Sequence, residues 1–93
     1  MMKFDELEFK EHPAGMGGIQ AVKTFPNGWG VSVIQTRFSY GGNRGLYELA
    51  VLGKGGLLHY DNNVANGDVR GYLTIEDVES LATEVESYDE IRD

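Results

Sequence analysis

The chain has 93 residues, 41% of them hydrophobic, a length that accommodates one domain rather than two. It contains no cysteine, so neither disulfides nor a thiolate zinc site can supplement the hydrophobic core. The formal net charge is -7, and residues 74–93 carry eight acids against one arginine, which disfavours direct binding to nucleic acid.

The N-terminal segment is charged where a signal peptide needs an apolar run, and no apolar run in the chain reaches membrane-spanning length. We therefore expect a cytoplasmic protein with no membrane partner. Residues 3–12 alternate around Leu7 and Phe9, which favours a half-buried strand over a short helix starting at Phe4. A glycine-rich loop follows, so residues 1–18 are expected to precede a single domain over residues 19–93.

A β-hairpin is the strongest local prediction. The segments 19–25 and 30–38 flank Pro26-Asn27-Gly28, and Asn-Gly supplies the two positive-φ positions of a type I′ turn. In the second strand, Val31 and Val33 share one face with Trp29, and the opposite face is also partly apolar. Two partly apolar faces are typical of a central strand.

Two more strands are expected at 46–52 and 57–61, with glycine-rich turns between neighbours and a polar loop over 62–70. Thr74 and Asp77 form a capping box at the start of a helix whose apolar stripe recurs at three- and four-residue spacing and whose order is expected to end near Tyr88. The short connections predict an α+β fold, an antiparallel β-meander of four to five strands with one C-terminal amphipathic acidic helix packed on one face.

Two sites for small ligands can be imagined, and neither fits its chemistry well. The oxygen-rich loop 62–68 follows Asp61, but Ala65 and Tyr72 stand where a calcium loop needs oxygen ligands. His59 could pair with a serine, yet nothing indicates a strained nucleophile or an oxyanion hole. We therefore predict no enzyme, no cofactor and no metal, and keep an ion or small-molecule module built on His59 and the 62–68 loop as an alternative.

Aromatic side chains are more numerous than one helix can cover. A single helix shields only one face of a sheet, and exposed aromatic patches usually mark interfaces. The interpretation we favour is a protein-binding surface on the uncovered sheet face, which contacts either another protein or a second copy of the chain. The expected partner-binding residues are Trp29, Phe38, Tyr40, Tyr47 and Tyr60.

The acidic helix gives a second binding hypothesis. Its carboxylates could imitate phosphates and occupy the basic groove of a nucleic-acid-handling protein, although a solvated helix face explains the same residues. The acidic face consists of Glu76, Glu79, Glu84, Glu86 and Glu90.

Four segments together resemble small uncharacterised proteins of tailed bacteriophages. They are the hairpin Phe25-Pro26-Asn27-Gly28-Trp29-Gly30-Val31-Ser32-Val33, the loop Ser39-Tyr40-Gly41-Gly42, the strand Gly45-Leu46-Tyr47-Glu48-Leu49-Ala50-Val51, and the helix start Gly71-Tyr72-Leu73-Thr74-Ile75-Glu76-Asp77-Val78. The resemblance covers residues 22–88 and brings no known activity. It implies a phage accessory protein that acts on a host or defence protein in the cytoplasm of an infected bacterium.

Overall fold

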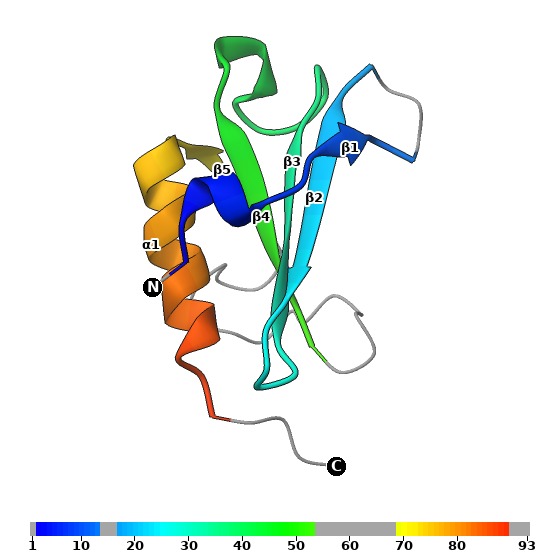
Figure 1. The fold of residues 1–93 in the computed structure, drawn as a ribbon. Helices are drawn as coiled ribbons and strands as arrows, with labels where there is room; N and C mark the ends of the chain where they lie inside the picture. Colours follow the sequence, from blue (N-terminus) through cyan, green and yellow to red (C-terminus); the bar gives the residue numbers. More distant parts are fainter. Residues whose placement is uncertain (1, 14–16, 54–68, 90–93) are drawn as a thin grey trace.

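The computed structural model describes residues 2–13, 17–53 and 69–89. Within these ranges, an antiparallel sheet has the strand order β1-β2-β3-β4-β5, and one α-helix lies along one of its faces (Figure 1). The sheet and its single helix confirm the predicted α+β meander. The strands are β1 (Lys10–Glu11), β2 (Ile19–Thr24), β3 (Gly30–Gln35), β4 (Tyr47–Leu52) and β5 (Val69–Leu73).

The predicted hairpin is present as β2 and β3, which pair antiparallel from Ile19↔Gln35 to Thr24↔Gly30. Gly28 has a φ of 90°, a conformation that glycine adopts without steric cost. The predicted type I′ turn is wrong, because Asn27 does not have the positive φ that this turn type requires at its first central position. Instead, the Gly28 amide donates to the Phe25 carbonyl at 3.0 Å, with Pro26 and Asn27 at the centre of the turn. Strand β3 then pairs with β4 on its other side, and this central position explains why both of its faces carry apolar residues.

The second edge of the sheet differs from the sequence prediction. Residues 69 and 70 were expected in a polar loop, but Val69–Leu73 forms β5 and pairs with β4. The register runs from Tyr47↔Leu73 to Ala50↔Val69, and its irregularity lies between Tyr47 and Leu49. There Gly71 and Tyr72 of β5 face the single residue Glu48 of β4 in a β-bulge. The strand predicted at 57–61 and most of the loop predicted after it lie outside the described residues.

Helix α1 (Ile75–Glu86) begins at the predicted cap. The Thr74 hydroxyl accepts a hydrogen bond from the Asp77 amide at 3.1 Å, and the Asp77 carboxylate accepts one from the Thr74 amide at 3.0 Å. The helix ends at Glu86, near the expected limit, with Ser87 as the C-cap. Val78, Ala82 and Val85 face the sheet and are fully buried.

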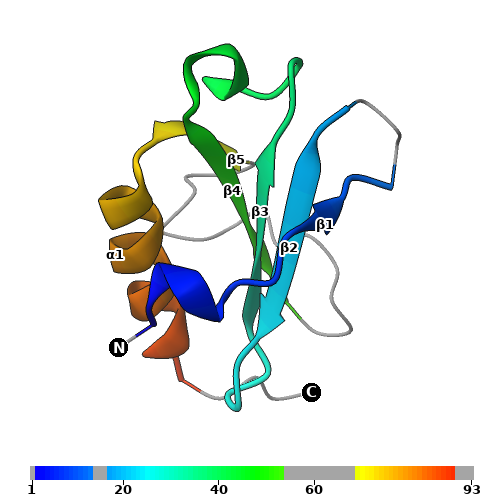
Figure 2. The same ribbon diagram turned by 45° about the horizontal axis from the view of Figure 1, so that its top comes forward.

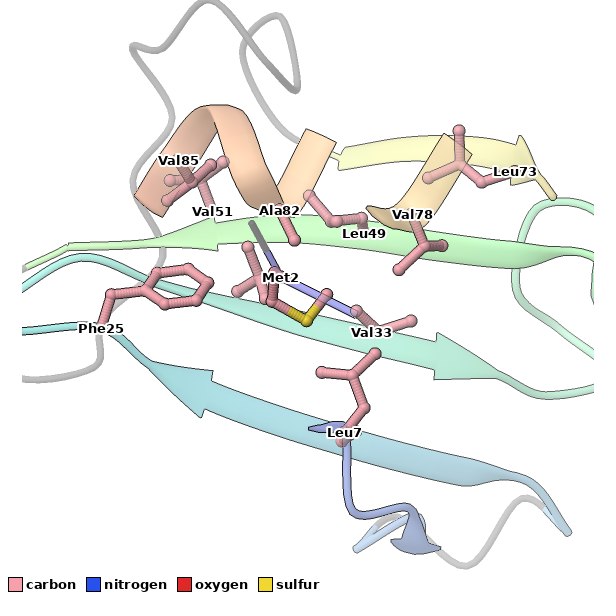
Figure 3. Close-up of a cluster of buried hydrophobic side chains, with 12 residues drawn as sticks. Met2, Leu7, Phe25, Val33, Leu49, Val51, Leu73, Val78, Ala82 and Val85 are labelled. Carbon is pink, nitrogen blue, oxygen red and sulfur yellow. The ribbon is translucent and has the colours of Figure 1, made fainter. Parts of the chain in front are cut away.

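These helix residues close one hydrophobic core against the inner face of β2, β3 and β4, as Figure 3 shows. The sheet contributes four valines and leucines without measurable exposure, each of which stabilises the fold by about 1.5–3 kcal/mol through burial. They are Val31, Val33, Leu49 and Val51.

The N-terminal segment is part of the same core. The strand predicted over residues 3–12 is replaced by a 3₁₀ turn, η1 (Phe4–Glu6), followed by the short edge strand β1. The Met2 amide donates to the Thr83 hydroxyl at 3.1 Å, and Met2 is 1% exposed. Figures 1 and 2 show this segment beside α1, so it packs on the helix side of the sheet before it reaches the edge.

Candidate functional site: an exposed aromatic tip

The connection between β3 and β4 forms a compact structure at one end of the sheet (Figure 2). Thr36 and Ser39 close its first turn, because the Thr36 amide donates to the Ser39 hydroxyl at 2.9 Å and the Ser39 amide donates back to the Thr36 hydroxyl at 3.0 Å. A 3₁₀ turn, η2 (Gly42–Arg44), completes the connection. Phe38 and Tyr40 project from this hydrogen-bonded loop and are 68% and 60% exposed.

Strand β5 brings a third exposed ring to the same place. The Tyr72 amide donates to the Tyr40 carbonyl at 3.1 Å, and Tyr72 is 59% exposed. Gly71 makes this approach possible, because a Cβ at that position would lie 2.3 Å from the Tyr40 Cβ. We call the three exposed rings Phe38, Tyr40 and Tyr72 the aromatic tip.

The backbone at Tyr72 is strained. Its φ is 57°, and it is the single non-glycine residue with positive φ in the described ranges. For a bulky side chain this left-handed conformation costs about 1–3 kcal/mol. The strain falls in the bulge where Gly71 and Tyr72 oppose Glu48, and bulges commonly re-aim a side chain. The Tyr72 side chain is 59% exposed, so its partial burial offsets only part of this cost.

Positive charge accompanies the aromatic tip. The Arg37 guanidinium lies 5.0 Å from the centre of the Phe38 ring, within the range of a cation–π contact. Arg44 is exposed on η2 in the same connection. Glu48 supplies a carboxylate, but its Oε1 accepts a hydrogen bond from the Tyr40 amide at 3.1 Å and so helps to fix the loop. The tip therefore presents rings and guanidinium groups on a firmly held backbone.

The five aromatic residues predicted to bind a partner do not form one surface. Phe38 and Tyr40 belong to the aromatic tip, whereas Trp29 and Tyr47 pack against the hydrophobic core on the helix side. Tyr60 lies outside the described residues. The predicted site does not include Tyr72, because the exposure of this residue depends on a bulge that no local sequence pattern indicates.

Trp29 closes the end of the molecule opposite the aromatic tip. Its ring packs edge-on against Tyr88, with the centroids 5.2 Å apart, and its indole Nε1 donates to the Asp89 carbonyl at 3.0 Å. The side chain therefore joins the β2–β3 turn to the residues that follow α1. This is a structural role.

Tyr47 belongs to a second aromatic cluster with the N-terminal segment. Its ring centroid lies 5.2 Å from that of Phe4 and 5.8 Å from that of Phe9. Each such pair contributes about 0.5–1.5 kcal/mol beyond area burial. The cluster holds η1 and the following residues on the sheet.

The described part of the uncovered sheet face carries aliphatic and polar side chains and no aromatic ring. Alternation along the strands places on this face Gln20, Val22, Thr24, Ser32, Ile34, Glu48, Ala50 and Leu52. Val22 is 58% exposed there, whereas Ala50 and Leu52 are each only 7% exposed, so this face is not uniformly open to solvent. Two of the rings assigned to this face from the sequence, Trp29 and Tyr47, instead pack against the hydrophobic core on the helix side.

The acidic face of the helix is only partly free for a partner. Glu76 and Glu84 are exposed, but the Glu79 Oε2 accepts a hydrogen bond from the Phe4 amide at 2.7 Å, which ties it to the N-terminal segment. Glu86 is half-buried, and Glu90 lies outside the described residues. The predicted acidic face therefore includes at least one carboxylate, that of Glu79, with a structural role.

The residues of the ligand-binding alternative, His59 and the 62–68 loop, also lie outside the described residues. In the part of the chain that the structure describes, His, Asp and Glu side chains do not gather in a group of three that could hold a metal ion. A depression of about 190 Å³ on the uncovered face is lined by His12, Ser32 and Glu48 among others. It contains a histidine and a carboxylate but shows no arrangement that activates the Ser32 hydroxyl as a nucleophile.

Comparison with protein-family models, curated proteins and solved structures gave no match. The helices within the described residues are too short or too polar to cross a bilayer.

Proposed function

We propose that the chain is a small non-enzymatic binding protein whose aromatic tip contacts a protein partner. The observation that carries the proposal is Tyr72, an exposed aromatic residue on strained backbone whose amide donates to the Tyr40 carbonyl, in the connection that also displays Phe38. A fold gains little from holding these rings in water, whereas tyrosine, phenylalanine and arginine are the residues enriched where proteins contact one another.

The resemblance to tailed-phage proteins suggests the class of partner. A host or defence protein in an infected bacterium is the first candidate, and a second copy of this chain is the other. The surface proposed here is the tip at the end of the sheet, which replaces the uncovered sheet face considered from the sequence.

Affinity capture tests the proposal with three baits. The wild-type chain, a tip variant with Phe38→Ser and Tyr40→Ser, and a control variant with Val22→Ser and Ile75→Ser are each immobilised at equal amounts in lysate from infected cells. Val22 and Ile75 are also exposed apolar residues, 58% and 45% accessible, but they lie outside the tip. Quantitative mass spectrometry then compares the proteins that each bait retains.

We expect a protein that the wild-type and control baits retain and that the tip variant loses by about tenfold or more, which corresponds to about 1.4 kcal/mol of binding free energy. Sedimentation of the three purified chains tests self-association in parallel. Equal retention by all three baits would contradict the proposal. So would the absence of both a retained protein and a concentration-dependent assembly.

A further inference from the structure

Asn27 joins the β2–β3 turn to the end of the helix. Its side-chain nitrogen donates to three main-chain carbonyls, those of Val85 at 3.0 Å, Glu86 at 3.1 Å and Tyr88 at 3.0 Å. Its side-chain oxygen accepts a hydrogen bond from the Trp29 amide at 3.0 Å. These carbonyls include ones that a helix leaves without an intrahelical partner, so the turn acts as a C-terminal cap supplied from a distant part of the chain.

Asn27 is also followed by a glycine, and this pair has a characteristic reaction. The Gly28 main-chain nitrogen can attack the Asn27 Cγ, because glycine has no side chain to hinder the approach. A new C–N bond closes a succinimide ring, the Gly28 nitrogen loses its proton, and the side-chain nitrogen leaves as ammonia. Water then opens the ring, and aspartate or isoaspartate stands where the asparagine was.

The folded structure opposes each requirement of this attack. The Gly28 amide donates to the Phe25 carbonyl at 3.0 Å, so the nucleophile is engaged in the turn. The Asn27 amide is held at both of its polar atoms and cannot rotate its Cγ toward Gly28 without breaking four hydrogen bonds. Local opening of the turn from the helix must therefore precede the reaction.

We propose that Asn27 is a latent deamidation site that the fold protects and whose modification makes opening of the helix end irreversible. The product carboxylate accepts hydrogen bonds but cannot donate them to the carbonyls of Val85, Glu86 and Tyr88. It also places negative charge at the negative end of the helix dipole, at the end of a helix whose last turn already contains the acidic residues Glu84 and Glu86. A chain that deamidates while open therefore cannot restore the same cap.

The sequence contains an internal reference for the test. Asn66-Gly67 repeats the dipeptide, and in urea both asparagines belong to the same unfolded chain. The wild-type protein is incubated at mildly alkaline pH with and without denaturing urea, digested, and analysed by peptide mass spectrometry. We expect Asn27 and Asn66 to deamidate at similar rates in urea, and Asn27 to react at least about tenfold more slowly in the folded protein.

Equal rates at Asn27 in the folded and unfolded protein would overturn the protection. An Asn27 that stays intact in urea while Asn66 reacts would overturn the assignment of the site.

The irreversibility is tested separately with Asn27→Asp, compared with wild type by urea unfolding and by indole fluorescence of Trp29. We expect a lower unfolding midpoint and a more solvated indole, because the cap and the neighbouring contact of Trp29 with Asp89 are lost together. Should Asn27→Asp prove too unstable to fold, partially deamidated wild-type protein provides the same comparison as a mixture. An unchanged midpoint in either sample would overturn this part of the proposal.

Discussion

At the scale of single residues, Tyr72 combines three features that seldom serve stability. Its φ is positive, it sits in a bulge at the edge of the sheet, and its ring is mostly in solvent. Its main-chain amide nevertheless holds the β3–β4 connection through Tyr40. The backbone at this position is therefore part of the fold, whereas the side chain is available for contact with another molecule.

Replacing Tyr72 with glycine separates these two contributions. Glycine relieves the left-handed strain, and the lost side chain was more than half exposed, so the unfolding free energy should stay within about 1 kcal/mol of wild type. Urea denaturation measures this. Tyr47→Gly is the matched control, because it removes a tyrosine that packs against Phe4 and Phe9 and should cost at least about 3 kcal/mol. A comparable cost at Tyr72 would show that its ring supports the fold.

Gly71 tests the geometry of the aromatic tip without removing a ring. A Cβ at this position would lie 2.3 Å from the Tyr40 Cβ, so Gly71→Ala must push β5 away from the β3–β4 connection. We expect a loss of about 1–3 kcal/mol from this overpacking and a change in the tyrosine near-ultraviolet circular dichroism. Gly45→Ala is a comparison for backbone strain alone, because its φ is 74° and nothing lies within 4 Å of the added Cβ. Gly71→Ala with unchanged stability and spectrum would contradict the close approach of Tyr40.

At the scale of elements, the N-terminus of α1 is stabilised by charge. Two interactions with Thr74, first the hydrogen bond from its main-chain amide and then the one with its side chain, lower the pKa of the Asp77 carboxyl below 3.8. Arg70 makes a smaller contribution in the same direction. A folded-state pKa below the unfolded one means that the charged cap stabilises the protein above about pH 3.8 and that this contribution is lost as the pH falls through the lower folded-state value.

Asp77→Asn checks this sign. Asparagine keeps an oxygen that can accept from Thr74 but carries no charge, so the variant should be less stable than wild type at neutral pH. The difference between the two proteins should shrink as the pH falls below about 3.8. Thermal unfolding over a pH series measures it. A difference that stays constant with pH would show that the charge of Asp77 does not contribute.

The N-terminal segment is an element of the core rather than a loose extension. Leu7 is 7% exposed and packs in the same cluster as the helix residues. Leu7→Ala should therefore cost about 2–4 kcal/mol in unfolding free energy, whereas Glu8→Ala, an exposed neighbour, should change it by less than about 0.5 kcal/mol. Equal small effects would mean that residues 2–12 do not stabilise the domain.

Elements set by local chemistry could be predicted from the sequence. Asn27-Gly28 indicates the place of the hairpin, although not its turn type, and Thr74 with Asp77 specifies the start of α1, because the residues that decide each structure lie within a few positions of one another. Strand β5 could not be predicted, because Gly71 interrupts its alternation and its pairing comes from β4, which is distant in the sequence.

The candidate site also combines features that local sequence indicates with features that depend on distant contacts. Exposed aromatics were expected at Phe38 and Tyr40, and the structure places both at the surface. Their proximity to Tyr72 depends on a contact between the β3–β4 connection and β5, which are far apart in the chain. The contacts of Trp29 and Asn27 with residues after α1 are equally non-local. The composition indicates more aromatic side chains than one helix can cover. It does not indicate which of them pack against the end of the helix and which against the N-terminal segment.

At the scale of the whole molecule, the two ends of the sheet differ in character. The end with the β2–β3 turn is closed by Asn27 and Trp29 against the residues that finish α1. The other end presents the aromatic tip with Arg37. Core aromatics thus hold the small fold together, and tip aromatics are displayed on it.

This division is tested most directly by the unfolding free energies of two double variants in urea. Phe38→Ala with Tyr40→Ala should lower stability by less than about 1 kcal/mol, since both rings are mostly exposed. Trp29→Ala with Tyr47→Ala should lower it by at least about 4 kcal/mol, since both rings pack on the core. A loss at the tip that equals the loss at the core would contradict the assignment of the tip to binding.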